Sequence, residues 1–265
     1  MVNARKRFGQ HFLEPAWVTK LIDAIAPSST DRFIEIGPGR GAITDPLAAR
    51  VQQLIAIEVD RDLAAALRAR GRPNTTVIQA DVLDVDLVAI AQQHGAPPLR
   101  IAGNLPYNIS SPILLRLLDA STSGLFMDAT LMLQKEVADR LAAQPGTGDY
   151  GVLTLSTMIR AEVTRLLSLP PGAFRPPPKV RSAVVRLAFR PPPSDVRNPQ
   201  LLIQIVRSVF TQRRKTMTNA LTPFAASRSL DAGSMLRTAG IDGQRRPETL
   251  TLSEYARLAE VVAVL

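Results

Sequence analysis

Short apolar segments alternate with segments of helical periodicity along the first part of the chain. The apolar segments, rich in Ile, Val and Leu, cover residues 32–37, 53–58, 75–79, 99–103 and 126–133. Runs of this kind are typical of strands buried on both faces. Helical patterns at 41–50, 61–70, 110–119 and 135–143 lie between or after them. The alternation predicts parallel β-α-β units, and therefore a doubly wound α/β sheet.

The pattern changes after residue 190. Two further strands are expected at about 162–168 and 181–189, close enough in sequence to pair antiparallel at one sheet edge. The segment RPPPSD at 190–195 has the composition of a stiff, extended linker. Asn198 and Pro199 then form a helix start, and only helical patterns follow, at 199–211, 213–221, 229–239 and 251–264. We expect an α/β domain at 1–190 and a small all-helical domain at 198–265.

Composition limits the class of protein. Hydrophobic residues make up 46% and charged residues 21% of the 265 residues, as in ordinary globular domains. No apolar run reaches the roughly 18 residues of a membrane span, and the basic N-terminus leads into Gly9 and Gln10 rather than into the apolar core of a secretory signal. We therefore expect a cytoplasmic protein without membrane contact, and a monomer.

Cysteine is absent and only two histidines, His11 and His94, are present. This composition excludes disulfides, thiolate nucleophiles, Cys-based zinc sites and iron–sulfur clusters, and it argues against a His-rich metal site. We predict no metal, and chemistry that depends on a bound organic cofactor.

The net charge of +9 is unevenly distributed. Between Asp31 and Arg100, eight basic residues stand against nine acidic ones, whereas the region from Arg190 onward holds eleven basic and six acidic residues. A near-neutral middle between basic segments indicates a small-molecule site beside a surface that binds a polyanion. The alternative is that the charge runs are solvated faces.

Three strand ends carry candidate cofactor ligands. The sequence EIGPGRG (35–41) follows the first strand, where glycines such as Gly37 let the backbone approach a ligand closely. Glu58 ends the second strand, placed to accept hydrogen bonds from ribose hydroxyls. Asp81 ends the third and is placed to accept one from an adenine amino group. A tight turn explains the glycines equally well, and a turn or helix cap explains Asp81. The glycines and Glu58 fit a nicotinamide cofactor as well as S-adenosylmethionine, and Asp81 begins to separate the two.

The tetrapeptide NLPY (104–107) follows the fourth strand and faces the same crevice. The exocyclic nitrogen of adenine is a poor nucleophile, because its lone pair is delocalised into the ring. Two acceptors aimed at its N–H groups, the Asn104 amide oxygen and the Leu105 carbonyl, would favour the tetrahedral form that accepts a methyl group. Tyr107 offers a ring for the base to stack on. Taken alone, the tetrapeptide is also a plain turn.

Phe174 is a candidate for a second aromatic wall. It lies in a proline-rich loop at 170–179, between the last two expected strands. Enzymes that modify bases hold an extruded base between aromatic or apolar side chains. The alternative is that Phe174 fills a local hydrophobic gap.

Together these motifs closely resemble the ribosomal RNA small-subunit adenine dimethyltransferase family. The matching segments are RKRFGQHFL (5–13), EIGPGRGAIT (35–44), IEVDRDLAAAL (57–67), GNLPYNISSPIL (103–114), MLQKEVADRL (132–141), FRPPPKVRSAVVRL (174–187) and FTQRRKTMTNAL (210–221). The resemblance implies a Rossmann-like class I methyltransferase domain and a helical C-terminal domain. It also implies N6,N6-dimethylation, from S-adenosylmethionine, of two adjacent adenosines in the 3′-terminal hairpin of 16S rRNA within the immature 30S subunit.

The resemblance assigns roles to individual residues. Catalytic roles fall to Asn104, Tyr107 and Phe174. Cofactor contacts are implied at His11, Leu13, Gly37, Glu58, Asp81 and Asn104; whether His11 acts through its side chain or backbone stays open. Contacts with RNA phosphates are expected at Arg5, Lys6, Arg7, Arg213, Arg214 and Lys215. The alternatives are that the first three belong to a disordered basic tail and that the last three form a solvated helix surface.

Three other functions remain to be weighed. An Erm-like enzyme that methylates a 23S rRNA adenine would use the same active site. A nicotinamide-dependent dehydrogenase explains the glycines and Glu58 but gives no role to NLPY or to the basic segments. An RNA-binding assembly factor with incidental methylation is the third.

Overall fold

The computed structural model describes residues 12–94 and 98–265, which form two compact units. Of the described residues, the first unit comprises 12–94, 98–138 and 162–189, and the second comprises 139–161 and 190–265. Within the described ranges, every helix is too short or too polar to cross a membrane.

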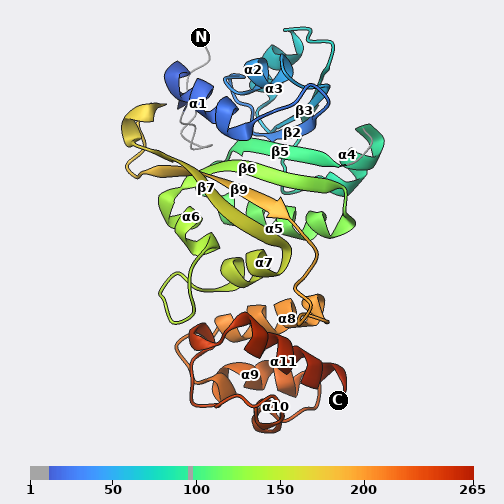
Figure 1. Cartoon of the computed structure of the whole chain (residues 1–265), viewed down its shortest axis with the longest axis vertical. Helices are drawn as coiled ribbons and strands as arrows, with labels where there is room; N and C mark the ends of the chain where they lie inside the picture. Colours follow the sequence, from blue (N-terminus) through green and yellow to red (C-terminus); the bar gives the residue numbers. More distant parts are fainter. Residues whose placement is uncertain (1–11, 95–97) are drawn as a thin grey trace. The chain divides into compact units, whose positions relative to one another are not determined.

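The first unit is built on a seven-stranded sheet with the order β4-β3-β2-β5-β6-β9-β7 (Figure 1). Its strands are β2 (Arg32–Ile36), β3 (Gln53–Glu58), β4 (Thr75–Gln79), β5 (Leu99–Asn104), β6 (Phe126–Gln134), β7 (Ala161–Leu169) and β9 (Ser182–Phe189). The five strands from β4 to β6 run parallel, and β9 pairs antiparallel with β6. This confirms the expected doubly wound α/β class, with the last two strands together at one edge.

Helices precede, connect and follow the parallel strands. They are α1 (Pro15–Ile25), α2 (Thr44–Ala48), α3 (Arg61–Arg68), α4 (Leu87–His94), α5 (Ser110–Ala120), the 3-10 helix η2 (Ser121–Ser123) and α6 (Lys135–Leu141). Helices α1, α2 and α3 lie on one side of the sheet and α5 on the other (Figure 1). The apolar side chains of β2 and β3, Phe33, Leu54 and Ile55 among them, are fully buried between these layers.

A short second ladder lies beside the main sheet. Strand β1 (Phe12–Leu13) pairs antiparallel with β8 (Phe174–Arg175), so that Leu13 faces Phe174 in register. The 3-10 helix η3 (Pro171–Ala173) precedes β8, and the Ala173 carbonyl accepts a hydrogen bond from the Glu14 N–H at 2.9 Å. The ladder therefore fastens the start of α1 to the proline-rich loop between β7 and β9.

A buried ion-pair network lies at the amino ends of the parallel strands. The Arg100 guanidinium donates to both carboxylate oxygens of Asp128, each at 2.9 Å, and to Asp31 Oδ2 at 2.7 Å. It also donates to the carbonyls of Ile25 and Ala26 at the end of α1. The network thus ties α1 to β5 and β6 and caps the last carbonyls of the helix.

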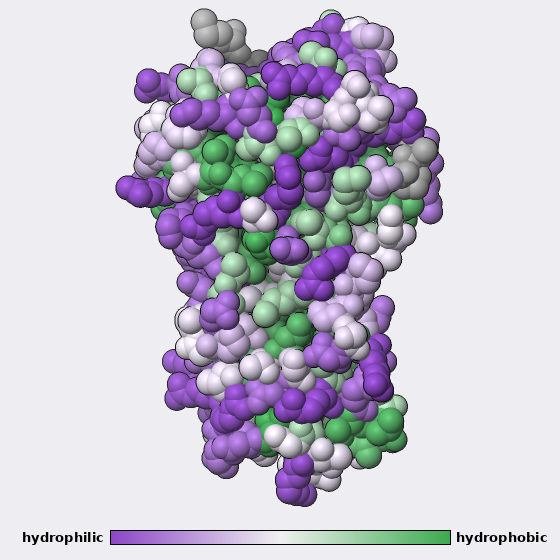
Figure 2. All heavy atoms as spheres, in the orientation of Figure 1, coloured by the Kyte–Doolittle hydropathy of each residue, from purple (hydrophilic) through white to green (hydrophobic). Residues whose placement is uncertain are grey.

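The second unit is helical. It contains α7 (Val152–Arg160), α8 (Pro199–Phe210), α9 (Met217–Ala226), α10 (Ala232–Thr238), η4 (Pro247–Thr249) and α11 (Leu252–Ala263). The last helix begins with a capping box, because Thr251 and Glu254 exchange side-chain-to-backbone hydrogen bonds. Hydrophilic side chains cover most of the visible face in Figure 2, as expected for packed cores with polar exteriors.

The division of the chain differs from the expected one in one segment. Residues 139–161, placed with the α/β domain by their position in the sequence, cluster with the C-terminal helices. The reason is packing: Tyr150, Leu155 and Ile159 are fully buried in the same apolar core as α8, α9 and α11. The Tyr150 hydroxyl also donates to the Leu250 carbonyl at 2.9 Å. The helical unit is therefore made from two stretches of chain.

Candidate active site

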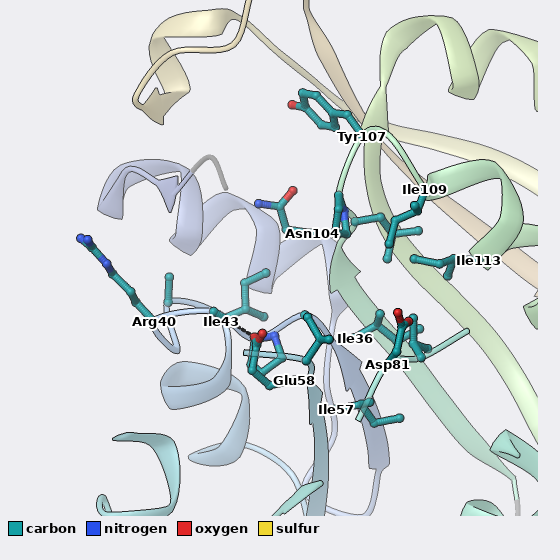
Figure 3. A pocket seen from close by; sticks show the side chains of 18 of the residues that line it. Ile36, Arg40, Ile43, Ile57, Glu58, Asp81, Asn104, Tyr107, Ile109 and Ile113 are labelled. Atoms are coloured by element: carbon teal, nitrogen blue, oxygen red, sulfur yellow. Dashed lines mark hydrogen bonds between the residues drawn. The ribbon is translucent and has the colours of Figure 1, made fainter. Parts of the chain in front are cut away.

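A cleft opens at the carboxyl ends of β2, β3, β4 and β5 (Figure 3). Four connecting segments supply most of its lining, at 36–43, 57–59, 80–82 and 104–109, and Leu13 and Ile113 complete it. Most of the lining side chains are apolar, with a few polar groups from strand ends. Ligands bind at this edge of open α/β sheets, so the cleft is the candidate active site.

The turn after β2 is shaped by glycine. Gly37, Gly39 and Gly41 have φ angles of 67°, 58° and 79°, in the left-handed region that other residues avoid. The Gly37 N–H donates to the Ile57 carbonyl at 3.0 Å. A Cβ atom on Gly37 would lie 3.7 Å from the Asn104 carbonyl oxygen, so this turn closely approaches the NLPY segment.

Glu58 lies at the centre of the cleft wall with only 4% of its surface exposed. Its Oε2 accepts a hydrogen bond from the Gly39 N–H at 2.9 Å (Figure 3), and its Oε1 accepts one from the Asp60 N–H at 2.9 Å. Burial raises the pKa of the carboxyl group, and these backbone donors oppose the rise. The two bonds hold the carboxylate against the glycine turn.

Asp81 follows β4 and also lines the cleft. Its Oδ1 accepts a hydrogen bond from the Leu83 N–H at 2.9 Å, which is the turn role weighed above. Its Oδ2 has no partner among the described residues. One oxygen therefore shapes the turn while the other remains available to a ligand.

The NLPY segment meets the cleft from β5. Asn104 is the last residue of that strand, and all four residues from Asn104 to Tyr107 line the cleft. The Leu105 N–H donates to the Met132 carbonyl at 3.1 Å, and the Ile109 N–H donates to the Pro106 carbonyl at 3.2 Å. These bonds fix the segment between β6 and the start of α5.

Gly103, one residue earlier, allows two strands to approach. A Cβ atom there would lie 2.6 Å from the Ile36 carbonyl oxygen of β2, so any other residue would force the backbone to shift. The strand end that carries Asn104 is thereby brought against the strand that leads into the glycine turn.

Tyr107 is held from the far edge of the sheet. Its hydroxyl hydrogen bonds with the hydroxyl of Ser182, the fully buried first residue of β9. Burial raises the pKa of Tyr107, so the phenol stays protonated at neutral pH. The ring points away from Glu58 and Asp81, on the other side of Asn104 (Figure 3).

Glu35 lies beneath the glycine turn in β2. Only 1% of its surface is exposed, and neither carboxyl oxygen has a hydrogen-bond partner in the described part of the chain. Burial raises its pKa to about 8; the Thr44 hydroxyl beside it lowers the pKa, and the charges of Glu58 and Asp45 raise it further. Glu35 is therefore mainly a neutral acid at pH 7.

Phe174 does not reach the cleft. Its side chain is fully buried in an apolar cluster with Leu13, Leu169 and Val184, and it is absent from the cleft lining. In this conformation the ring cannot stack on a base. This position agrees with the alternative interpretation, in which Phe174 fills a local hydrophobic gap. The ring faces inward because β8 pairs with β1.

The predicted basic RNA contacts lie in two places. Arg5, Lys6 and Arg7, like His11, lie outside the described residues. Arg213 donates to Glu248 Oε2 at 2.6 Å and to the Thr147 carbonyl at 3.1 Å. Arg214 and Lys215, in the turn after α8, are exposed. Arg213 is therefore anchored within its unit, whereas the next two cations face solvent.

Sequence reasoning missed most of the apolar lining of the cleft, of which Val59 and Val82 are two examples. Each directly follows an acidic strand-end residue, and Val59 keeps 43% of its surface exposed. Their positions next to Glu58 and Asp81 were a usable signal, because adjacent residues at a strand end reach the same edge of the sheet.

Comparison with known proteins extends these observations along the whole chain. The family model described as ribosomal RNA adenine dimethylase matches residues 1–263. Ribosomal RNA small subunit methyltransferase A of Paracidovorax citrulli is 45% identical over 260 residues, covering 98% of either chain. The protein of the same name from Methylibium petroleiphilum is 46% identical over 257 residues, covering 97% of this chain and 95% of its own.

Solved structures agree with the sequence matches. A dimethyladenosine transferase from Plasmodium falciparum aligns with a TM-score of 0.73 at 25% identity, covering 94% of this chain and 96% of its own. The 23S rRNA methyltransferase ErmE aligns with a TM-score of 0.64 at 27% identity, covering 95% and 99%. The resemblance inferred from the sequence motifs is confirmed, and the chain belongs to the ribosomal RNA adenine dimethylase family.

Proposed function

We propose that this chain transfers methyl groups from S-adenosylmethionine to N6 of two adjacent adenosines in the 3′-terminal hairpin of small-subunit rRNA, within the immature 30S subunit. The observation that carries the proposal is the meeting of Asn104 with Gly37 and Glu58 in one cleft. A cofactor site and an acceptor for an adenine amino group thus share one opening.

The cleft residues fit the cofactor. A buried carboxylate at Glu58 suits two ribose hydroxyls, and the second Asp81 oxygen suits an adenine amino group. Gly37 and Leu13 would lie against the remainder, since Gly37 has no side chain to obstruct a ligand. When bound, S-adenosylmethionine supplies an electrophilic methyl group.

Asn104 and its neighbours act on the base. The Asn104 amide oxygen and the Leu105 carbonyl would accept hydrogen bonds from the adenine amino group, which localises the nitrogen lone pair as the methyl group arrives. The nitrogen loses its proton readily once it carries positive charge, so no strong base is required. Catalysis of this kind rests on positioning and electrostatics. Tyr107, held by Ser182, would stack on the base.

The test is methyl transfer from labelled S-adenosylmethionine to unmethylated 30S subunits, followed by mass spectrometry of nucleosides. We expect N6,N6-dimethyladenosine from the wild type, and a rate about 100-fold lower from Asn104→Ala, the effect of losing one preorganised polar group. Cofactor affinity measured by calorimetry is the control: because Asn104 is also an expected cofactor contact, we expect a smaller loss there, and the rates are compared at saturating cofactor.

Two results would contradict the proposal. Transfer to 23S rRNA but not to 30S subunits would place the chain with the Erm-like enzymes. Transfer to neither substrate, with the cofactor still bound, would favour an RNA-binding assembly factor.

We further propose that Arg214 and Lys215 contact rRNA phosphates, together with Arg5, Lys6 and Arg7. The exposure of Arg214 and Lys215 supports this role. Arg213, bonded to Glu248 and Thr147, would hold their turn in place and add less to binding directly. Such contacts position RNA without reading its sequence.

Changing Arg214 and Lys215 to Ala together should weaken rRNA binding and flatten its salt dependence. Each lost phosphate contact lowers the slope of log K against log salt by about 0.7 to 0.9, so a total change of roughly 1.5 is expected in filter-binding titrations. Arg228→Ala with Arg237→Ala removes the same charge elsewhere in the unit and is the matched control. An equal change in both pairs would mean that only net charge matters.

A further inference from the structure

Arg70 lies in the turn after α3, directly against the glycine turn that lines the cleft. Its Nη2 donates to the Arg40 carbonyl at 2.5 Å, and its Nη1 donates to Asp45 Oδ2. One guanidinium therefore bridges a backbone carbonyl within the glycine turn and a carboxylate in the first turn of α2. Arg70 itself is absent from the cleft lining, so any effect on a ligand passes through the turn.

Gly41 provides the space for this contact. A Cβ atom at Gly41 would collide with Nη1 of Arg70 and lie 3.0 Å from its Cζ. The φ angle of 79° at Gly41 is itself one that glycine adopts without strain. Glycine is therefore favoured at position 41 for two reasons. It adopts the left-handed conformation without strain, and it leaves room for the Arg70 guanidinium beside the turn.

A second arginine completes the arrangement. Arg72 Nε donates to Asp45 Oδ1 at 3.0 Å, so that both oxygens of one carboxylate are held by cations from the α3–β4 connection. The three side chains are only partly exposed, at 35% for Arg70, 37% for Asp45 and 39% for Arg72. A single exposed ion pair contributes little to stability. A planar guanidinium that bonds two acceptors within a network does, however, fix the relative position of those acceptors.

The cleft side of the same turn is also fastened. The Gly39 N–H donates to Glu58, while the Arg40 carbonyl, one residue later, accepts from Arg70. The two consecutive residues are therefore held from opposite sides, by the proposed cofactor ligand and by Arg70. In Figure 3 the Arg40 side chain extends away from Glu58, so it is the Arg40 backbone that the fork restrains.

We propose that Arg70 is a positioning residue for S-adenosylmethionine: by bridging the Arg40 carbonyl and Asp45, it holds the glycine turn in the conformation that receives the cofactor. This inference rests on the proposed cofactor site. Without the fork, the turn has more conformations in the free protein, and the cofactor must select one of them. The loss then appears in cofactor affinity rather than in the methyl transfer step at saturation.

The test is the Kd of S-adenosylmethionine, measured by calorimetry on the full chain, for Arg70→Met and Arg70→Lys. We expect Kd to rise about tenfold, the equivalent of one hydrogen bond to a charged group. The rate at saturating cofactor should stay within about twofold of the wild type. Lysine keeps the charge and the stem but loses the planar fork, so it should not rescue binding.

The matched control is Arg68→Met. Arg68 is the last residue of α3, two positions before Arg70, and it donates twice to the Val77 carbonyl, at 3.1 and 3.3 Å, but neither bond involves the glycine turn. We expect its Kd to match the wild type. If the Arg70 variants bind the cofactor as well as Arg68→Met does, or if they differ from it only in melting temperature, the positioning role is wrong.

Two further measurements separate the possible failures. Glu58→Ala tests the cofactor site itself, and an unchanged Kd for S-adenosylmethionine would mean that the proposed cofactor site is wrong. If Glu58→Ala raises Kd and Arg70→Met does not, the cofactor site stands and only the positioning role of Arg70 is rejected. In a double-mutant cycle, Arg70→Met and Asp45→Ala should be less than additive in their effect on Kd. Full additivity would overturn the proposal even where single variants lose stability.

Discussion

The two ends of the parallel sheet treat buried polar groups in opposite ways. At the amino ends, Arg100 meets Asp128, Asp31 and two helix carbonyls, so that its charge is paired and hydrogen-bonded. Arg186 joins this network through the Ala24 and Ile25 carbonyls and lies 3.7 Å from Asp128, and only its Nε lacks a hydrogen bond among the described residues. At the carboxyl ends, Glu35 and Thr44 are equally buried, yet their side-chain oxygens have no partner among the described residues.

The difference separates stability from function within one layer of structure. A buried polar group without a hydrogen-bond partner lowers the free energy of unfolding. Folds retain such groups mainly at functional sites. The paired end contains none of the residues that line the cleft, and the unpaired end carries the glycine turn. The amino end of the sheet is therefore stabilised by a hydrogen-bonded ion-pair network, whereas the carboxyl end contains buried polar groups that destabilise the fold.

The largest effect is expected from breaking the paired end. Asp128→Ala removes the bidentate partner of Arg100 and leaves a buried charge partly uncompensated, which typically lowers the free energy of unfolding by about 3 kcal/mol. Chemical denaturation measures the loss. Affinity for S-adenosylmethionine, measured where the variant is folded, should be unchanged because the network lies at the opposite end of the strands.

Asp23→Ala is the control for that variant. Asp23 is 65% exposed and lies 3.6 Å from Arg50, so its loss should change the free energy of unfolding by no more than about 0.5 kcal/mol. If both substitutions have the same effect, burial does not distinguish the two ion pairs and the comparison fails.

A smaller, pH-dependent effect is expected at the unpaired end. Because burial raises the pKa of Glu35 to about 8 from 4.5, the folded chain binds this proton more tightly than the unfolded chain. The free energy of unfolding therefore falls as the pH rises from about 4.5 to 8, and it levels off above that. Glu35→Gln resembles the protonated form and does not titrate, so it should remove this decline.

Melting temperatures at pH 5 and pH 8 measure it. Wild type and Glu35→Gln should be similar at pH 5, and the variant should melt higher at pH 8. Glu162→Gln, at an exposed position of β7, should follow the wild type at both pH values. A variant that melts lower than the wild type at pH 8 would show that Glu35 has a partner in solution.

The sequence predicted the strands better than the helices. All seven main strands were expected close to their observed bounds, because runs such as those of β3 and β6 are apolar on both faces. Helices α1, α4 and α7 were not predicted. The start of α9 was placed several residues early, since a basic pattern after Phe210 resembles a helix but forms turns before Met217.

Site residues were predictable where they end a strand. Glu58 and Asn104 do so and Asp81 lies two residues beyond the end of β4, and the topology of a parallel sheet brings such positions together. Phe174 was not predictable in this way, because its orientation depends on pairing with a distant strand, β1. The partners of Tyr107 and Arg70 likewise arise from tertiary packing that local patterns do not encode.

The two-part composition of the helical unit has a consequence for synthesis. During translation, residues 139–161 emerge long before α11, yet Tyr150, Leu155 and Ile159 find their full core only when the last helix arrives. In the nascent chain, this apolar stretch therefore remains exposed to solvent even after β9 has been synthesised, and such a state is prone to aggregation. For the same reason, a fragment cut at the proline linker would expose these side chains permanently.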